Sequence, residues 1–190
     1  MDHRNDAATA FLQTRRSHPP RLLTPPAPDR DEVMALLTMA ARVPDHGKLE
    51  PWRFVVLRRD TLDRLAPLLR DAVLAAGQDE AAADKAASAF ASPLIVAVIS
   101  APVASDKVPE WEQVLSAGAV CLGLVNAALA RGWGACWLTG FAALDRAFAA
   151  THLGVAGDER IAGLIHLGTR GAPPPDRPRP DIASKTTWLE

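Results

Sequence analysis

Hydrophobic side chains recur at helical spacing along residues 33–41, and the pattern then changes to a β-branched and aromatic run at residues 52–57. The first run predicts an amphipathic helix and the second a strand. Between them lies the polar loop 44–51, with the sequence PDHGKLEP. Its two prolines restrict the residues that precede them, while Gly47 supplies flexibility. The loop therefore holds its polar side chains in place, for either catalysis or solvation.

Helix-start signals define three helices in the first half of the chain, of which the second is the helix described above. Asp6 predicts the N-cap of a first helix, and Asp29 with Glu32 has the spacing of a capping box for the second. A third helix begins at Thr61 and is expected to be interrupted at Pro67. Further patterns predict an extended, non-helical connector at 18–28, a mobile helical cover at 78–90, a strand buried on both faces at 94–99, a short apolar segment at 133–138, a helix at 142–150 and a strand at 161–167.

A long helix and a proline-rich arm indicate an interface between subunits. Pro109 suits the first position of the helix, and residues 114–130 contain no charged side chain, as expected of a helix surrounded by protein. Its small residues near Gly118 would let another helix approach closely. Residues 172–180, APPPDRPRP, cannot form a helix or a central strand and must lie extended on something.

Composition narrows the class of protein. The 190 residues, 48% of them hydrophobic, fit one domain at 1–171 with an arm at 172–190. A net charge of −1 argues against a general nucleic-acid or membrane-surface binder. The N-terminus shows no secretory pattern and no uncharged apolar stretch is long enough to span a bilayer, so we expect a cytoplasmic protein. Cys121 and Cys136 lack metal or disulfide spacing and are predicted to be buried thiols.

Arg15, Arg16 and Ser17 follow the first helix and allow two explanations. Two cations at a helix C-terminus interact favourably with the helix dipole, which is an ordinary structural role. Guanidinium groups beside a hydroxyl can also surround a phosphate with charge-assisted donors. The residues alone leave both explanations open.

Taken in order, these motifs resemble the FMN-dependent nitroreductase family, and specifically its short bacterial NAD(P)H-nitroreductase members. The resemblance covers most of the chain and depends on the ordered set, since each motif alone is weak. The motifs are RRS at 15–17, RVPDH at 42–46 followed by PW at 51–52, KVPEWEQ at 107–113, SAG at 116–118, AALARG at 127–132, GACWLTGF at 134–141 and IAGLIHLGT at 161–169.

The resemblance implies an α+β fold with a central, mostly antiparallel sheet flanked by helices. It also implies a homodimer in which the C-terminal arm is exchanged onto the partner. The arm and the small-residue helix, inferred above from the residues, agree with that arrangement. Lys48 and Glu50 depart from the family's usual Asn and Gln, and Arg170 stands where close relatives tend to have Pro.

The family's flavin contacts can be carried over residue by residue. Arg15 and Ser17 resemble the FMN phosphate ligands, and a backbone N–H at Thr139 or Gly140 is expected to face N5 of the flavin. The implied FMN contacts are Arg15, Arg16, Ser17, Arg42, His46, Trp137, Leu138, Thr139, Gly140 and Arg179. The segment aligned with NAD(P) binding consists of Ala127, Ala128, Leu129, Ala130, Arg131 and Gly132. For His46 a loop-stabilising hydrogen bond is the alternative, and for Trp137 it is packing with only the backbone near the flavin.

By the same resemblance, the protein passes electrons from NAD(P)H through FMN to small electron-poor acceptors, such as nitroaromatics or quinones, with ping-pong kinetics. The flavin carries the chemistry, so we expect neither a catalytic acid–base pair nor a metal. Arg42 and Lys48 are candidates for stabilising the reduced flavin. Two other classes stay open: a flavin-binding protein without turnover, and a scaffold whose arginines hold another phosphate.

Overall fold

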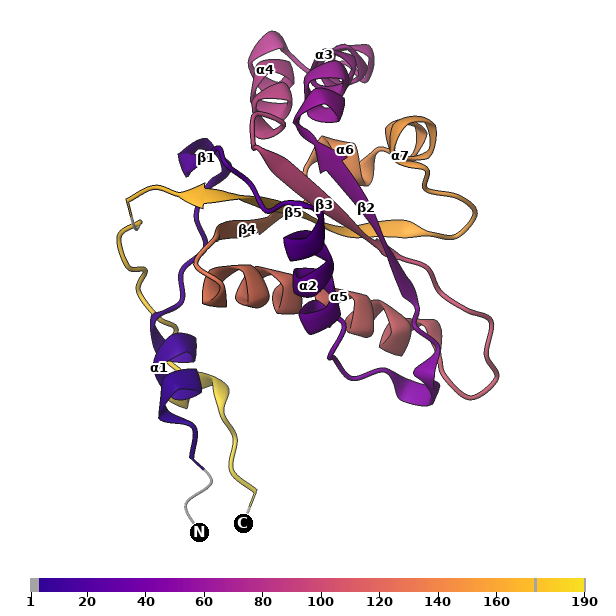
Figure 1. Cartoon of the computed structure of the whole chain (residues 1–190). Coiled ribbons are helices and arrows are strands. Elements are labelled where there is room, and N and C mark those ends of the chain that lie inside the picture. The colour runs from indigo at the N-terminus through magenta and orange to yellow at the C-terminus, as the bar shows by residue number, and fades with distance from the viewer. Residues whose placement is uncertain (1–3, 173, 190) are drawn as a thin grey trace.

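A five-stranded sheet lies between two layers of helices in the computed structural model, which describes residues 4–172 and 174–189 (Figure 1). Every strand pair is antiparallel. The strands are β1 (Leu23–Thr24), β2 (Trp52–Arg58), β3 (Leu94–Ser100), β4 (Gly134–Leu138) and β5 (Arg160–Arg170). The long strand β5 pairs with β3 along one side and with β4 and β1 along the other, so β4 is an edge strand. The predicted α+β architecture with an antiparallel sheet is confirmed.

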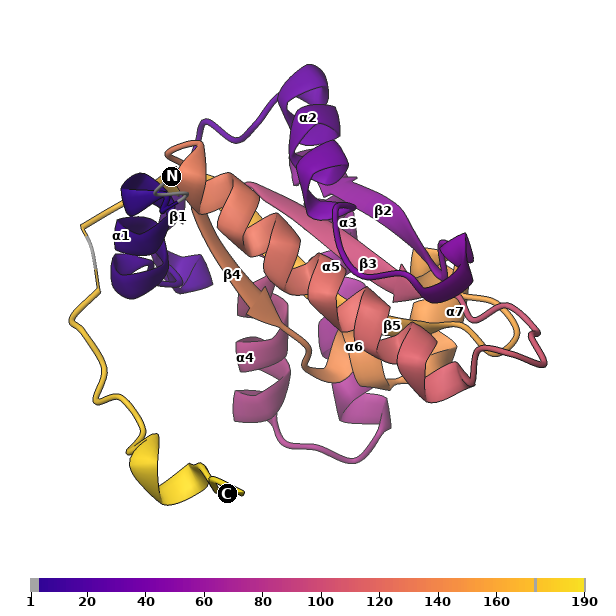
Figure 2. The same cartoon turned by 90° about the horizontal axis from the view of Figure 1, so that it is seen from below.

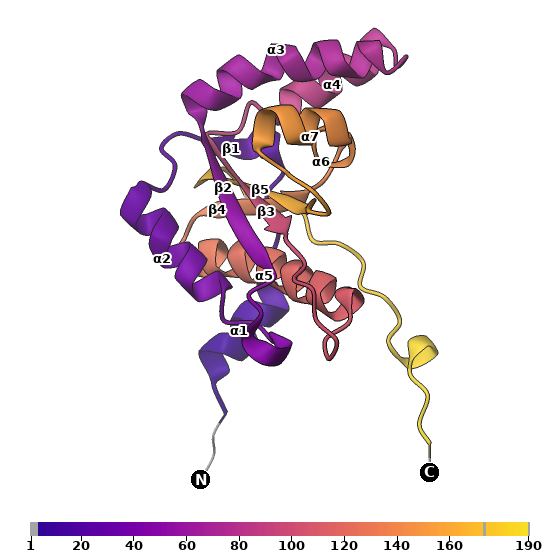
Figure 3. The same ribbon diagram turned by 90° about the vertical axis from the view of Figure 1, so that its right-hand side faces the viewer.

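The helices divide between the two faces of the sheet. One layer contains α2 and α5, and the other contains α3, α4, α6 and α7 (Figures 1 and 3). The α-helices are α1 (Asp6–Thr14), α2 (Arg30–Ala40), α3 (Arg59–Ala75), α4 (Glu80–Ala89), α5 (Glu110–Ala130), α6 (Phe141–Leu144) and α7 (Arg146–Leu153), and 3-10 turns occupy Pro20–Leu22, His46–Lys48 and Ala183–Lys185.

Strand β3 explains why the sheet has two cores. All seven of its residues are buried, as the uninterrupted apolar run predicts. Leu94, Val96 and Val98 face α2 and α5, whereas the alternating Ile95 and Ile99 face α3 and α7. Covering both faces with helices is what an unbroken hydrophobic strand requires, because successive side chains point in opposite directions.

Several expected boundaries differ in the structure. The N-cap of α1 is Asn5, whose side chain accepts a 3.0 Å hydrogen bond from the Ala8 N–H, and not Asp6. Pro109 is the N-cap of α5 and not its first residue. The helix expected at 142–150 is two helices, because Asp145 leaves the helical conformation and caps α7 through the Phe148 N–H. The connector 18–28 contains a 3-10 turn and the short strand β1. The capping box of Asp29 and Glu32 is confirmed.

Pro67 does not interrupt α3, contrary to expectation. The proline itself is exposed, while Leu62, Leu65 and Leu69 form a fully buried stripe against the sheet. Burial of such a stripe stabilises the helix by several kcal/mol, at about 1.5–3 kcal/mol for each leucine. This exceeds the roughly 3 kcal/mol that an interior proline costs, so the helix continues.

Two terminal segments extend away from the body (Figures 1 and 3). Helix α1 has no buried residue, and the C-terminal arm is exposed along most of its described length. Helix α5 is long and apolar enough to meet a length-and-hydropathy test for a membrane span. However, 56% of its most apolar window is buried inside the fold, which is typical of a core helix. Phe11 of α1 packs against the core beneath α2 and α5, whereas the described part of the arm contributes no residue to either core.

Candidate functional site

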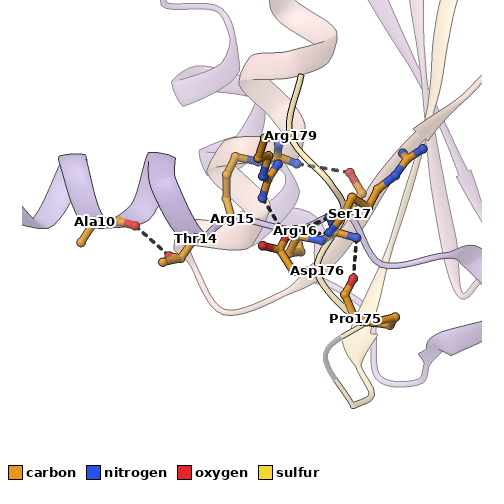
Figure 4. Close-up of polar contacts among 9 residues, drawn as sticks. Ala10, Thr14, Arg15, Arg16, Ser17, Pro175, Asp176 and Arg179 are labelled. Atoms are coloured by element: carbon orange, nitrogen blue, oxygen red, sulfur yellow. Dashed lines mark hydrogen bonds and ion pairs between the residues drawn. The ribbon is translucent and has the colours of Figure 1, made fainter. Parts of the chain in front are cut away.

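A basic pocket of about 480 Å³ forms where the end of α1 meets the edge strand β4 and the C-terminal arm. Segments from both ends of the chain therefore meet there (Figures 2 and 4). The pocket is lined by Arg15, Arg16, Ser17, Pro19, Pro20, Cys136, Trp137, Leu138, Pro174, Arg177 and Arg179. The structure thus brings together six of the residues implied as FMN contacts: Arg15, Arg16, Ser17, Trp137, Leu138 and Arg179.

The guanidinium of Arg15 is directed toward Ser17. Its NH2 group donates a 3.2 Å hydrogen bond to the Ser17 hydroxyl, and among the described residues the guanidinium makes no hydrogen bond to the last carbonyls of α1 (Figure 4). Burial lowers the pKa of Arg15, and the neighbouring Arg16 and Arg179 lower it further. Such crowding of like charges favours a bound anion, because an anion offsets both the repulsion and the desolvation. This geometry supports the phosphate interpretation over the helix-end interpretation.

Two buried guanidinium atoms of this pocket have no hydrogen-bond partner in the described chain. They are the Nε atoms of Arg15 and Arg16. A buried donor without a partner costs about 1–3 kcal/mol, and more when it is charged. Phosphate oxygens could accept hydrogen bonds from these unpaired donors. The pocket therefore fits the phosphate end of a nucleotide-like cofactor.

Asp176 of the arm supplies a carboxylate to the same cluster. Its Oδ1 accepts hydrogen bonds from Arg16 at 3.3 Å and from Arg179 at 2.9 Å, and Arg16 also donates to the Pro175 carbonyl at 2.8 Å. The Arg177 N–H, together with the two arginines, lowers the pKa of Asp176. The arm is therefore fastened to the basic pocket by the same charges that would meet a phosphate.

The end of β4 presents backbone groups beside open space. Gly140 has φ +75°, and a Cβ atom added there would meet nothing within 4 Å. Neither the Thr139 nor the Gly140 N–H donates a hydrogen bond to another part of the described chain. N–H groups without a partner on an accessible turn can donate hydrogen bonds to atoms at the edge of a flat ring. The predicted N5 contact is compatible with this arrangement and remains a prediction.

The side chain of Trp137 is held by packing. Its indole Nε1 donates to the Ala162 carbonyl at 3.2 Å. A Cβ atom on Gly163 would lie only 2.2 Å from that nitrogen, so the indole occupies space that only glycine leaves free. The indole is 40% exposed. These contacts agree with the packing alternative considered for Trp137, and its contact with the flavin remains a prediction.

A second cavity, of about 470 Å³, continues past Leu138 between the end of β4 and helices α3 and α4. Leu138 lines both cavities, and Thr139 and Gly140 line the second one. Its polar lining also includes Gln78, Lys85 and His166, which sequence reasoning did not select. A histidine within the apolar strand IAGLIHL and a lone lysine in the latter part of an alanine-rich helix were the available signals.

Arg42 and His46 lie away from these cavities in this chain. The Nδ1 atom of His46 is 2.8 Å from a Glu112 carboxylate oxygen at the start of α5, and the Ser116 hydroxyl donates to the Pro44 carbonyl. The basic pocket lies toward the other end of α5, a helix of about 30 Å. Within one chain the loop-stabilising role of His46 is therefore the one seen.

The segment aligned with NAD(P) binding forms the end of α5. Ala127, Ala128 and Leu129 are buried in the core, while Ala130, Arg131 and Gly132 are exposed. None of the six lines either cavity described above. Packing accounts for the first three residues, and a role of this segment in NAD(P) binding remains a prediction.

Cys121 and Cys136 are free and buried, as predicted. Burial raises the pKa of each thiol to about 12. Both are therefore protonated at neutral pH, and the thiolate form required of a nucleophile is not available.

The fold and the pocket together define an α+β protein with a basic pocket at the edge of an antiparallel sheet. The chain belongs to the nitroreductase family, whose sequence profile matches residues 12–169. A relative from Escherichia coli (strain K12), named "Putative NAD(P)H nitroreductase YdjA", is 35% identical over 163 residues, covering 85% of this chain and 87% of the relative. A Haemophilus influenzae protein named "Putative NAD(P)H nitroreductase" is 36% identical over 169 residues, covering 85% and 88% of the two chains.

Solved structures share the fold. A nitroreductase-like protein from Bacillus cereus superimposes with a TM-score of 0.78 at 24% identity, covering 100% of this chain and 99% of that one. A Bacteroides fragilis nitroreductase, whose structure contains bound FMN, gives a TM-score of 0.73 at 21% identity, covering 98% and 100%. At these identities the comparison establishes the architecture alone.

Proposed function

We propose that this protein is an FMN-dependent oxidoreductase that passes electrons from NAD(P)H to small electron-poor acceptors such as nitroaromatics and quinones. The observation that carries the proposal is the convergence of Arg15, Arg16, Ser17 and Arg179 on one pocket, with two buried guanidinium donors unpaired. Membership of the nitroreductase family and the FMN in a similar fold support the same conclusion.

FMN, when bound, supplies the hydride and electron chemistry, and the chain supplies binding and orientation. Arg15, Arg16, Ser17 and Arg179 would hold the phosphate. Leu138 lines both this pocket and the second cavity, where the Thr139 and Gly140 N–H groups have no partner among the described residues and would be available to the flavin ring. The described residues form this basic pocket for one phosphate, and the sequence contains no glycine-rich pyrophosphate loop, which favours FMN over FAD.

We further propose that the protein is a homodimer that exchanges its C-terminal arm. Trp111, Leu115 and Leu122 are 62%, 61% and 48% exposed and lie along one face of α5, at spacings of four and seven residues. Such an apolar stripe on the surface of a monomer marks a protein–protein contact. A partner bound there would also explain how Arg42 and His46, remote from the pocket in their own chain, could reach a flavin in the other.

The arm supports the same proposal. Trp188 and Leu189 are 83% and 95% exposed near its end, so the described residues leave both side chains largely uncovered. We expect deletion of residues 172–190 to release flavin and to lower stability, because the arm carries Arg179 and would bury apolar surface on the partner. A truncated protein that keeps full flavin content would contradict the role of the arm.

Mass spectrometry of the released cofactor tests the assignment. The expected result is FMN, and steady-state kinetics with NAD(P)H and a quinone should give the parallel reciprocal plots of a ping-pong mechanism. Recovery of FAD, or no flavin after reconstitution, would contradict the proposal. FMN without reaction with NAD(P)H would instead favour a flavin-binding protein without turnover.

A further inference from the structure

The cavity of about 470 Å³ contains one buried polar group that nothing in the described chain satisfies. Most of its lining is apolar and comes from α3, α4, α6 and the strands β4 and β5. His166, on β5, belongs to this lining and is only 1% exposed, yet its Nε2 atom has no hydrogen-bond partner. Buried polar atoms in folded proteins are almost always paired, so this nitrogen indicates a ligand in the cavity.

The other ring nitrogen of His166 fixes which atom carries the proton. Nδ1 lies 2.8 Å from the hydroxyl oxygen of Ser92, a residue that is fully buried. Among the described residues the Ser92 hydroxyl has no other hydrogen-bond partner, so the arrangement that uses its proton has the hydroxyl donating to His166 Nδ1. Nδ1 therefore accepts, and the neutral ring carries its hydrogen on Nε2.

Burial also keeps this ring neutral. It lowers the pKa of His166 to about 4, so the imidazole is uncharged at neutral pH. The lining residue His166 therefore carries an uncharged N–H donor in an apolar surrounding, and Lys85 is the only cationic residue among the described residues of this lining. A flat, largely apolar ring with carbonyl oxygens on one edge matches that lining.

We propose that His166 is a positioning residue whose Nε2–H donates a hydrogen bond to a carbonyl oxygen on the pyrimidine edge of the flavin ring, with Ser92 holding the imidazole. The inference rests on the proposed FMN function. Its geometric basis is that the two cavities adjoin at Leu138, which lines both. If the basic pocket binds the phosphate, the ring at the other end of the cofactor would enter the cavity that His166 lines.

A donor at this edge would influence the flavin as well as hold it. Reduction increases the negative charge on the pyrimidine part of the ring, so the hydrogen bond is stronger in the reduced state. His166 should therefore bind the reduced ring more tightly than the oxidised ring and raise the midpoint potential. A residue that only supports the fold would not change this potential in a systematic direction.

The test compares His166→Leu, His166→Gln and Ser92→Ala with the wild type, using calorimetric titration of FMN and of lumiflavin into apoprotein. Lumiflavin has the ring but neither ribityl chain nor phosphate. Removing the donor with His166→Leu should weaken both ligands about tenfold, which corresponds to one net hydrogen bond of about 1.4 kcal/mol. His166→Gln keeps a donor and should lose less.

The midpoint potential supplies a second measurement on the same variants. His166→Leu should shift the midpoint potential to a more negative value. The shift is about 30 mV for each tenfold fall in the ratio of the affinities for reduced and oxidised flavin. Arg15→Ala is the matched control, because it should weaken FMN and leave lumiflavin unchanged. Ser92→Ala should change the ligand affinities and the midpoint potential in the same direction as His166→Leu, but by smaller amounts. It therefore provides the test if His166→Leu does not fold.

The inference would be overturned if His166→Leu left both the lumiflavin affinity and the midpoint potential unchanged. If His166→Leu does not fold, the same result in Ser92→Ala would overturn it. Flavin binding by the wild type would still support the proposed function in that case. Absence of any flavin binding by the wild type would overturn the proposed function itself. The two failures are therefore distinguishable.

Discussion

At the scale of single residues, the site is defined by polar groups that lack a partner. The Nε atoms of Arg15 and Arg16 and the Nε2 atom of His166 are buried without one. The arginines were selected from the sequence because they stand together with Ser17 after a helix. His166 was not selected, because one histidine in a strand is ordinarily a paired core residue, and only the three-dimensional arrangement shows that Ser92 satisfies one nitrogen and leaves the other.

Arg15→Ala separates the phosphate role of this arginine from a helix-end role. Charge-assisted contacts to a phosphate contribute about 1.5–3 kcal/mol each, so FMN affinity should fall roughly ten- to a hundredfold. Riboflavin lacks the phosphate, and its weaker binding should change little. Calorimetric titration of both ligands into apoprotein provides the measurement.

Arg21→Ala is a suitable control. Arg21 is an exposed arginine on the connector 18–28, and it does not line the pocket. It should leave FMN affinity unchanged. If FMN and riboflavin weaken equally in Arg15→Ala, the arginine acts through the structure and not through the phosphate.

Acid sensitivity of the fold should depend on His166. Its pKa in the folded protein is about 4, below the ordinary 6.5, so the unfolded chain binds a proton first as the pH falls. The folded state therefore loses stability between about pH 6.5 and pH 4, by roughly 3 kcal/mol for this shift. Urea unfolding across that range should show a shallower decline in His166→Gln than in the wild type. Parallel declines would show that His166 is not buried in its neutral form.

At the scale of elements, most of the fold followed from the pattern of hydrophobic residues. The fully buried β3, the capping box at Asp29 and the long core helix α5 were predictable, because each depends on local sequence. The continuation of α3 through Pro67 and the break at Asp145 were not, because packing against the sheet decides both. The pairing of β4 with β5 at the edge of the sheet is likewise a long-range contact, and it determines where the site lies.

The contact between α2 and α5 depends on Gly123. A Cβ atom at this position would lie 2.9 Å from the Ala40 carbonyl oxygen and 3.2 Å from its Cα atom, which are backbone atoms that cannot rotate away. Gly123→Ala should therefore destabilise the protein by about 1–3 kcal/mol. Helix propensity alone predicts the opposite sign, a gain of about 1 kcal/mol. The sign of the change in urea denaturation decides between close packing and propensity.

At the scale of the whole molecule, one chain looks incomplete in consistent ways. One face of α5 is apolar and exposed, α1 has no fully buried residue, and Trp188 near the end of the arm is 83% exposed. The loop that contains His46 lies away from the pocket that it was expected to complete. A second copy of the chain would account for all of these features, and no sequence pattern within one chain could have specified how the two copies meet.

Leu115→Glu tests the proposed dimer face. Leu115 is 61% exposed on α5, so a charge there leaves the fold of one chain intact but is costly in a buried interface. Sedimentation equilibrium should show a dimer for the wild type and a monomer with reduced flavin content for the variant. Leu144→Glu, on α6 in the other helical layer and 72% exposed, should remain dimeric. A dimeric Leu115→Glu protein would place the interface elsewhere.

The central claim, that the chain binds FMN and uses it to accept electrons from NAD(P)H, is tested most directly by anaerobic addition of NAD(P)H to the purified protein. The yellow absorbance of bound flavin should bleach in proportion to the nicotinamide added and return when a quinone or nitroaromatic compound is supplied. Arg15→Ala protein, loaded at an FMN concentration that saturates it, should bleach in the same proportion, because Arg15 holds the phosphate and not the ring. Flavin that stays oxidised in the presence of excess NADH and excess NADPH would contradict the account.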